Sequence, residues 1–329
     1  MYDVITIGSA TRDVFLRSHA LQLHKAKNIP GLIEACFPFG AKINVEELTV
    51  ETGGGATNNA VTFSRMGKLR TAALARVGLD SAGDDVVRAL KRDHVATALM
   101  QRTAREQTAY STILLSGAAE RTILVHRGAS AKIESAKIPW AKLKARLFYV
   151  SSLSGDLALL RKILDHAAKT ETAVYMNPGG GELRHGMKKL APLFARLDLL
   201  IMNRDEAAQL TGKKRSDTKA LIRALQRTSA HAVMTDGPGG AYAITQSGSF
   251  YMPVLPATTI NLTGAGDAFG SAFAVGLIKY HDIKVALALG TMNATSVVQH
   301  TGAKVGIIRR MPTIKEIGRV RATTKQLPY

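Results

Sequence analysis

The chain has 329 residues, of which 46% are hydrophobic and 5% aromatic, so it can bury a large core in one or two domains. Its formal net charge is +19, from 44 basic and 25 acidic residues. The basic residues are scattered along helical segments without interleaved aromatics, which favours solvated basic faces over a nucleic-acid site. Such a field still attracts small anions, including nucleotides.

The N-terminal residues and the single cysteine bear on the cellular compartment. Asp3 stands where a signal peptide has a basic region, and the apolar run after it is short. No stretch approaches the ~18 apolar residues of a membrane-spanning helix. Cys36 is the only cysteine, which excludes an internal disulfide. We therefore expect a cytoplasmic protein with no membrane partner.

The first segment of the chain predicts a buried strand and then a small inserted sheet. Residues 3–7 form an apolar run that ends at Gly8-Ser9, with Asp13 a few residues on. Residues 14–50 contain no crossover-helix pattern. They contain short β-prone pieces separated by prolines and glycines, at 14–16, 32–37 and 43–45.

A glycine-rich stretch, Gly53-Gly54-Gly55, comes before a helical pattern that runs toward Met66. Because glycine has no side chain, backbone N–H groups can line a pocket there. Asn58 and Asn59 add donors and acceptors that suit a hydroxyl-rich ligand. Taken alone, this stretch is explained as well by an ordinary helix-capping loop.

From Thr71 onward, strand and helix patterns alternate. Residues 110–115 and 122–126 predict a hairpin across 117–120. The alternation predicts an α/β fold in which helices cover both faces of a parallel sheet and ligands gather at the carboxyl ends of its strands. The predicted strands are 72–77, 147–151, 172–176, 198–202 and 231–235, and the predicted helices are 83–92, 156–169, 186–196, 204–211 and 217–227.

Two polar motifs fall at predicted strand ends. Asn203 ends one strand and Glu206 lies in the first turn of the next helix, so the pair either caps that helix or holds magnesium through waters. Thr235 ends another strand and is followed by Gly237 and Gly240, which predict a tight turn whose amides could meet a phosphate.

The most unusual stretch is Thr263-Gly264-Ala265-Gly266-Asp267. It follows a β-branched segment, 258–260, which predicts a strand, and it precedes an apolar run that predicts a buried helix from near Asp267. Glycine amides and the helix dipole suit this turn to developing negative charge, although Asp267 alone could be a helix cap. The stretch fails the dinucleotide-binding fingerprint, and the chain has no P-loop motif.

Together, and in this order and spacing, these motifs resemble the ribokinase-like (PfkB) family of carbohydrate and nucleoside kinases over nearly the whole chain. Any one of them alone is weak. The matching motifs are Gly8-Ser9 with Asp13, Gly53-Gly54 with Asn58, Val77-Gly78-Leu79-Asp80 with Gly83, Glu120-Arg121-Thr122 with Gly128-Ala129, Asn203 with Glu206, Thr235 with Gly237 and Gly240, and Asn261-Leu262-Thr263-Gly264-Ala265-Gly266-Asp267.

The resemblance implies a three-layer α/β/α ribokinase-like fold with a mostly parallel central sheet and a small inserted β-sheet lid. The catalytic domain would comprise residues 1–13, 51–97 and 107–329, and the lid residues 14–50 and about 98–106. Two copies would pair through the lid. The implied activity is ATP-dependent phosphorylation of a sugar hydroxyl, in particular a hydroxymethyl group, with a nucleoside as the alternative acceptor. A basic binding protein on a kinase fold is a third hypothesis, against which Asp267 and Glu206 argue.

The resemblance also implies a role for each matching residue. Asp267 would be the general base, and the turn of Gly264, Ala265, Gly266 and Asp267 would stabilise the transferring phosphoryl group. Asp13, Gly53, Gly54 and Asn58 would hold the acceptor, Asn203 and Glu206 would order Mg²⁺ and the phosphates, and Thr235, Gly237, Gly240 and Asn293 would line the nucleotide.

Two departures from the family pattern bear on ions and acceptor. Asn261 stands where much of the family has an acid that helps to form a monovalent-cation site. Asparagine keeps a carbonyl oxygen but loses the charge, which weakens the expectation of a K⁺ site. Residues 151–154 lack the acid that ribose-specific members tend to carry after this strand, which weakens ribose as the acceptor.

Overall fold

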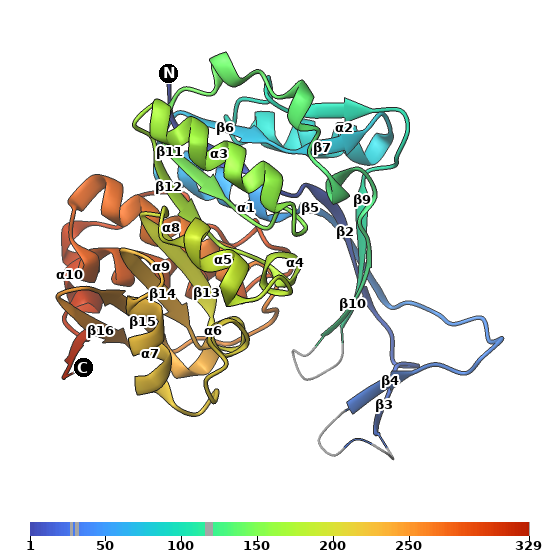
Figure 1. The fold of residues 1–329 in the computed structure, drawn as a ribbon. Helices are drawn as coiled ribbons and strands as arrows, with labels where there is room; N and C mark the ends of the chain where they lie inside the picture. Colours follow the sequence, from blue (N-terminus) through green and yellow to red (C-terminus); the bar gives the residue numbers. More distant parts are fainter. Residues whose placement is uncertain (27–28, 30–32, 116–120, 329) are drawn as a thin grey trace.

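The computed structural model describes residues 1–329 except 27–28, 30–32, 116–120 and 329. A nine-stranded sheet runs through the main body (Figure 1). In spatial order its strands are β17 (Lys325–Leu327), β16 (Gly248–Met252), β15 (Ala241–Thr245), β14 (His231–Thr235), β13 (Leu199–Asn203), β12 (Ala173–Met176), β11 (Ala145–Val150), β1 (Tyr2–Ile7) and β6 (Thr71–Leu74).

The strands from β6 to β14 are parallel, and β15, β16 and β17 are added antiparallel at one edge. The parallel strands are apolar on both faces, as β1 shows with Val4, Ile5 and Ile7 completely buried. Such runs form where helices cover both sides of a sheet. The predicted, mostly parallel central sheet is therefore confirmed.

Helices cover both faces of the sheet, which makes three layers. One face packs against α3 (Leu157–Lys169), α5 (Met187–Phe194), α6 (Arg204–Thr211) and α7 (Thr218–Gln226). The other packs against α1 (Gly55–Arg65), α8 (Ala265–Tyr280), α9 (Ile283–Val298) and α10 (Ile314–Arg321). The remaining helical segments are α2 (Ser81–Arg92), α4 (Gly180–Leu183), η1 (Gly128–Ala131), η2 (Ser135–Lys137), η3 (Trp140–Lys142) and η4 (Gly237–Gly239).

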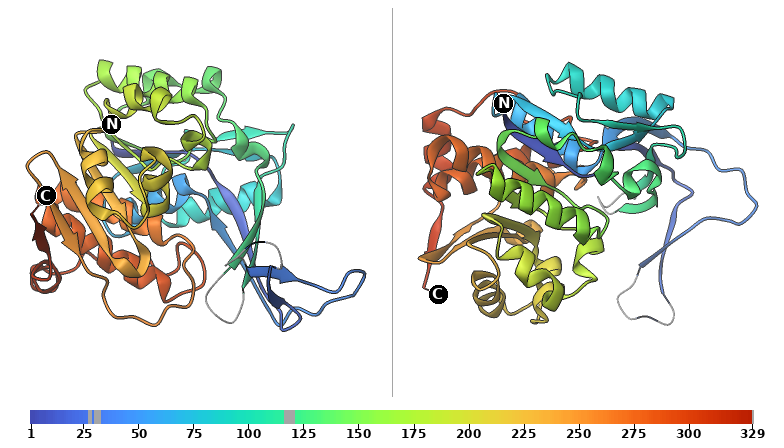
Figure 2. Two further views of the ribbon diagram at one scale, coloured as in Figure 1. Left: turned by 60° about the horizontal axis from the view of Figure 1, so that its bottom comes forward. Right: turned by 45° about the horizontal axis from the view of Figure 1, so that its top comes forward.

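A separate four-stranded sheet projects from the main body (Figure 2). Its order is β10 (Arg121–His126), β9 (Ala109–Leu115), β2 (Thr11–Arg17) and β5 (Glu47–Gly53). A hairpin of β3 (Gln22–Lys25) and β4 (Ile33–Cys36) extends beyond it. The inserted small sheet is thus confirmed, as is the pairing of the predicted hairpin strands, whose connecting residues 117–120 lie outside the described part of the chain.

Three expectations about the small sheet are wrong. The strands β9 and β10, which lie within the expected catalytic segment 107–329, belong to this sheet. Residues 98–106 do not join it, because β8 (Gln101–Thr103) pairs with β7 (Arg76–Gly78) in a separate ladder. The side chain of Gln101 is also tied to the backbone of Glu134, which fixes β8 beside the main body. Residues 43–45 form no strand and lie in an exposed loop.

The segment before the glycine turn also differs from its prediction. Residues 258–260 are irregular and form no strand. After β16 the chain must return from the antiparallel edge to the middle of the molecule, and on the way it joins none of the sheets formed by the described residues. It is anchored at its end, where the N–H groups of Ile260 and Asn261 both donate to the carbonyl of Val298.

No helix in the described ranges is both long and apolar enough to cross a membrane.

Candidate active site

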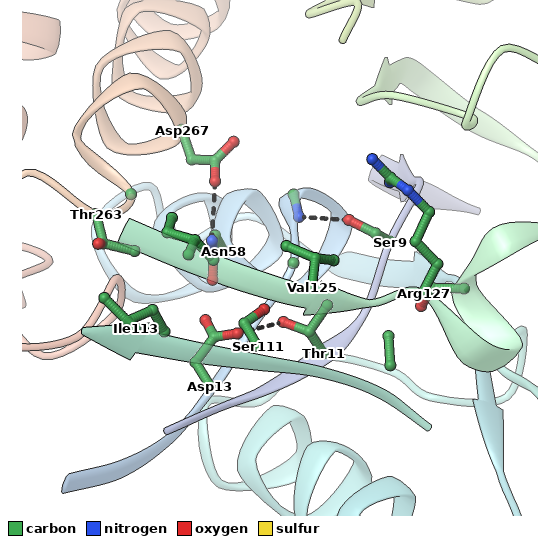
Figure 3. Close-up of a pocket in the computed structure, with 16 residues that line it drawn as sticks. Ser9, Thr11, Asp13, Asn58, Ser111, Ile113, Val125, Arg127, Thr263 and Asp267 are labelled. Carbon is green, nitrogen blue, oxygen red and sulfur yellow. Dashed lines mark hydrogen bonds between the residues drawn. The ribbon is translucent and has the colours of Figure 1, made fainter. Parts of the chain in front are cut away.

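A cavity of about 280 Å³ lies where the small sheet meets the main body (Figure 3). The small sheet contributes Asp13, Ser111 and Ile113 to its wall, and the main body contributes Asn58 and Asp267. Three segments far apart in the sequence therefore meet here: the start of α1, the start of α8 and the inner face of the small sheet. This is the place predicted for the acceptor.

The glycine turn forms one end of this cavity and begins α8. Gly264 is the N-cap of the helix and has φ 81°, a left-handed conformation that favours glycine. A side chain at this position would also collide with Ala303. The first amides of a 16-residue helix thus face the cavity end, where the helix dipole favours negative charge.

Two asparagines of α1 fix the carboxylate of Asp267. Asn58 Nδ2 donates to Asp267 Oδ2 at 2.8 Å, and Asn59 Nδ2 donates to Oδ1 at 3.4 Å. Asn59 is itself held by the carbonyl of Gly55 and the hydroxyl of Ser151. Both carboxylate oxygens are therefore oriented before any ligand binds.

The pKa of Asp267 is raised above its ordinary value. Burial is the largest cause and raises it, the hydrogen bonds from Asn58 and Asn59 and the charge of Lys304 lower it, and the charge of Asp13 raises it again. A carboxylate with a raised pKa is a stronger base, which suits it to accept a proton at neutral pH.

Asp13 lies on β2, is almost completely buried and lines the same cavity. Its Oδ1 accepts a hydrogen bond from Thr11 Oγ1 at 2.8 Å. Gly53 on β5 leaves the room that the carboxylate occupies, since a Cβ there would collide with Asp13 Oδ2. Gly54 has φ 93° and approaches the backbone of Ser9 too closely for a side chain. The two glycines are therefore required by the geometry of the site.

Asn203 and Glu206 lie beyond the cavity, at the start of α6. They form a reciprocal capping box, in which Asn203 Oδ1 accepts from the Glu206 N–H and Glu206 Oε2 accepts from the Asn203 N–H, each at 2.8 Å. Burial raises the pKa of Glu206, the hydrogen bond from Asn203 lowers it, and the charges of Asp267 and Asp205 raise it. Glu206 and Asp267 therefore interact electrostatically.

The predicted nucleotide turn lies beside this pair. Thr235 is the register partner of Asn203 in adjacent strands, so the two predicted ligands sit at neighbouring strand ends. Gly237 and Gly240 have φ 50° and 86°, conformations that favour glycine. Asp236 within the turn forms an ion pair with Arg204 at 3.0 Å, which anchors the turn to α6.

The structure does not bring Asn293 to the site. Its side chain is completely buried between helices, where Nδ2 donates to the carbonyl of Ala268 at 2.9 Å and Oδ1 accepts from the N–H of Ile308 at 3.0 Å. Both polar atoms are satisfied by the protein. Asn293 thus fastens α9 to α8, and its expected contact with the nucleotide is not supported by this geometry.

Asn261 is also buried, and its geometry bears on the expected cation site. Its Oδ1 accepts from the N–H of Thr263 at 2.7 Å, while Nδ2 has no hydrogen-bond partner among the described residues. A buried N–H donor does not fit a bound cation. Elsewhere in the described ranges, no group of three or more His, Cys, Asp or Glu side chains could hold a metal.

Four residues of the site were missed in the sequence. Thr11 and Ser111 belong to the inner face of the small sheet, which the alternation of β2 and of the hairpin could have indicated. Arg127 follows β10 and lines the cavity, and it forms no ion pair within the described part of the chain. Lys304, which influences Asp267, has no local sequence signal.

The chain matches the family model "pfkB family carbohydrate kinase" over residues 3–309. It is 27% identical to the ribokinase of Mus musculus over 276 residues, covering 80% of this chain and 84% of that protein. It is 25% identical to the ribokinase of Staphylococcus aureus (strain COL) over 332 residues, covering 96% of this chain and 99% of that protein.

Solved structures show the same fold at lower identity. The Arabidopsis thaliana ribokinase in complex with ribose and ATP has a TM-score of 0.77 at 19% identity, covering 97% of this chain and 98% of that one. The Burkholderia thailandensis nucleoside kinase in complex with inosine has a TM-score of 0.75 at 17% identity, with the same coverage.

Proposed function

The chain belongs to the pfkB family of carbohydrate kinases and is a phosphotransferase with an alcohol group as acceptor; from this premise we propose that it transfers the γ-phosphate of ATP to a hydroxymethyl group of a sugar. The observation that carries the proposal is the oriented carboxylate of Asp267, which lies in the cavity next to the amides of the glycine turn.

Asp267 accepts the proton of the attacking hydroxyl. As the acceptor oxygen bonds to the γ-phosphorus, the bond from that phosphorus to the β,γ-bridging oxygen breaks and ADP leaves. A positioned general base contributes roughly 10²–10⁴-fold to the rate. Asp13 and Asn58 line the same cavity and hold the acceptor's other hydroxyls, so that one hydroxyl points at Asp267.

The glycine turn stabilises the charge on the transferring group. The amides of Ala265, Gly266 and Asp267 begin α8, where the first N–H groups have no intrahelical partners. The N–H of Ala265 donates to the carbonyl of Leu262 at 3.3 Å, so Gly266 and Asp267 supply the principal donors. These donors are fixed before the reaction, because the conformation of Gly264 and its contact with Ala303 hold the turn. Phosphoryl-transfer enzymes act mostly by positioning the reactants and by stabilising developing charge with such fixed donors.

The strand ends at Asn203 and Thr235 would receive the nucleotide, with Gly237 and Gly240 leaving room for its approach. Mg²⁺, when bound with the nucleotide, neutralises phosphate charge. The residues fit such an ion: the charge of Asp267 raises the pKa of Glu206, and a cation held near Glu206 would offset that repulsion. Since no described three-ligand cluster exists, Glu206 would act through water and the phosphates would supply other ligands.

The small sheet would act as the lid, and the rest of the described chain as the catalytic domain. Closure would exclude water from the cavity and limit hydrolysis of ATP. Leu48, Val50 and Leu124 are exposed on the face of this sheet turned away from the cavity. Pairing of two copies through the lid would bury these residues, and light scattering after gel filtration measures it.

The experiment that tests the proposal is a panel of acceptors. ATP consumption and the phosphorylated product are measured with neutral sugars, sugars that carry a carboxylate or phosphate, and nucleosides, with and without Mg²⁺. The charged arm is included because the guanidinium of Arg127 is free of ion pairs in the described residues. Turnover confined to nucleosides would favour the alternative acceptor. Ligand binding without turnover for every class of acceptor would overturn the proposed kinase activity and favour a binding protein.

A further inference from the structure

Lys304, in the loop after α9, is a buried cation that the proposed reaction does not use. Its side chain is 6% exposed. The ammonium donates to the carbonyl oxygen of Thr52 at 2.8 Å and to Thr52 Oγ1 at 2.9 Å. Within the described ranges it forms no ion pair with a carboxylate. Burying an ammonium without such a partner destabilises a fold, so a residue of this kind indicates a role other than stability.

Both ends of Lys304 are fixed to other parts of the active-site region. Its carbonyl oxygen accepts a hydrogen bond from Arg65 Nη1 of α1 at 2.7 Å. Arg65 is itself held by Asp93, at the end of α2, through two hydrogen bonds of 2.9 and 2.7 Å. The backbone of Lys304 is therefore tied to α1 while its ammonium is tied to β5.

The same loop touches the anion-binding turn. Ala303 packs so closely on Gly264 that a side chain at Gly264 would collide with it. On the other side, Thr52 is followed by Gly53, the residue that leaves room for the carboxylate of Asp13. Lys304 thus spans the distance between the two ends of the cavity: the turn that would hold the phosphoryl group and the strand that would hold the acceptor.

Charged side chains on several neighbouring elements act on the ammonium of Lys304. The acids that act on its ammonium are Asp13 of β2, Glu51 of β5, Asp93 of α2 and Asp267 of α8, and Arg65 is the neighbouring base. Burial is the largest effect on Lys304 and lowers its pKa to about 8, whereas these acids raise it.

The ammonium does not reach the substrate. Thr52 is the register partner of Arg12, and Gly53 is that of Thr11, so the side chain of Thr52 points to the face of β5 opposite Asp13. Lys304 therefore acts on the cavity through the strand, by charge and by position.

We propose that Lys304 is a positioning residue for phosphoryl transfer: its ammonium locks β5 to the glycine turn and favours the ionised carboxylate of Asp267. The inference rests on the proposed function, because it gives Asp267 the role of base. Asp13 and Asp267 line one cavity of about 280 Å³, where the charge of Asp13 raises the pKa of Asp267 and the charge of Lys304 lowers it. A protonated Asp267 cannot accept a proton from the acceptor.

Three variants separate charge from structure. Lys304→Met removes the charge and keeps much of the length, Lys304→Arg keeps the charge, and Thr52→Val removes one hydrogen-bond acceptor and keeps the charge. With the best acceptor from the panel, kcat/KM is measured from pH 5 to 9, together with Tm. We expect the acid limb of the Lys304→Met profile to move to a pH about one unit higher. At a pH below the limb, kcat/KM should be about tenfold lower than in the wild type, and above the limb it should recover.

The matched variants decide the interpretation. Lys304→Arg and Thr52→Val should keep the acid limb of the wild type, even where Thr52→Val lowers Tm. An unchanged acid limb in a folded Lys304→Met variant would overturn the role of the charge. So would a loss of kcat/KM that is equal at every pH and that Thr52→Val reproduces. If the wild type phosphorylates no acceptor, it is the proposed function that fails.

A second measurement does not depend on turnover or on the folding of Lys304→Met. The titration of the Lys304 ammonium is followed by NMR of ¹³C-labelled lysine in the wild type and in Asp267→Asn. Coupling between two charges is reciprocal, so loss of the Asp267 charge should lower the midpoint of Lys304. Identical midpoints in the two proteins would contradict the proposal.

Discussion

The side chains of Asn58 and Asp267 are joined by a 2.8 Å hydrogen bond between residues 209 positions apart in the sequence. Asn58 belongs to the helix that follows the Gly53-Gly54 pair, and Asp267 to the helix that follows the glycine turn. The bond therefore connects the acceptor side of the cavity to the side that would stabilise the phosphoryl group (Figure 3). It makes the orientation of the base dependent on the acceptor-binding helix.

Replacing Asp267 by asparagine tests the base most directly. Asp267→Asn keeps the size of the side chain but cannot take up the proton, so kcat should fall by roughly 10²–10⁴-fold. Nucleotide affinity, measured by calorimetry, should change little, because Asn203, Thr235 and their neighbours are untouched. A kcat near that of the wild type would rule out Asp267 as the base.

Removal of the Asn58 hydrogen bond should affect activity in a pH-dependent way. This bond lowers the pKa of Asp267, so Asn58→Ala should raise that pKa and move the acid limb of the kcat/KM profile to higher pH. We expect a loss of roughly tenfold near the wild-type limb and a smaller loss at higher pH. A loss that is the same at every pH would instead show that Asn58 acts only in binding the acceptor.

The parts of this site that the sequence reveals are those with a local signal. Gly53, Gly264 and Asp267 stand in short motifs whose spacing is visible along the chain. The apolar runs of β1 and α8 predict that these two elements are buried. Lys304 carries no such signal, since its contact with Thr52 joins residues 252 positions apart. Asn293 has no local signal either, because an asparagine in a helical pattern does not indicate that its partners are Ala268 and Ile308.

The errors in the fold have the same origin. Residues 98–106 contain a short β-prone piece, and only the tertiary structure decides that β8 pairs with β7 and not with the small sheet. Residues 258–260 have high strand propensity but join no sheet in the described part of the chain. Strand propensity describes the fit of a residue to a sheet, so it fails where no sheet is within reach.

Gly53→Ala should damage acceptor binding selectively. The added methyl group would collide with Asp13 Oδ2, and the carboxylate must move out of its place in the cavity. We expect KM for the acceptor to rise roughly tenfold to a hundredfold, while KM for ATP stays close to that of the wild type. The matched control is Gly318→Ala in α10, where the new methyl group meets open space and should leave both constants unchanged. Equal KM values for the acceptor in the two variants would contradict this account of Asp13.

The burial of Lys304 predicts a dependence of stability on pH. Its pKa falls from 10.5 to about 8 in the folded protein, chiefly through burial, so the folded state binds fewer protons than the unfolded state between these values. The destabilisation is therefore full below pH 8 and is relieved as the pH rises toward 10.5. Relative to Lys304→Met, the wild type should gain about 3 kcal/mol of unfolding free energy across this window. Urea unfolding of both proteins at pH 7.5, 9 and 10.5 measures this difference. If the difference in unfolding free energy between the wild type and Lys304→Met were the same at all three pH values, the buried charge would be contradicted.

Asn261 predicts how the rate responds to potassium. Its carbonyl oxygen already accepts the N–H of Thr263, and its unpartnered Nδ2 would face any cation bound there. The rate should therefore be flat when K⁺ replaces tetramethylammonium at constant ionic strength. Asn261→Asp keeps the bond to Thr263 and puts a charged oxygen in the place of Nδ2, so this variant should gain stimulation by K⁺. Stimulation of the wild type, with none gained by the variant, would show that Asn261 does not govern the ion dependence.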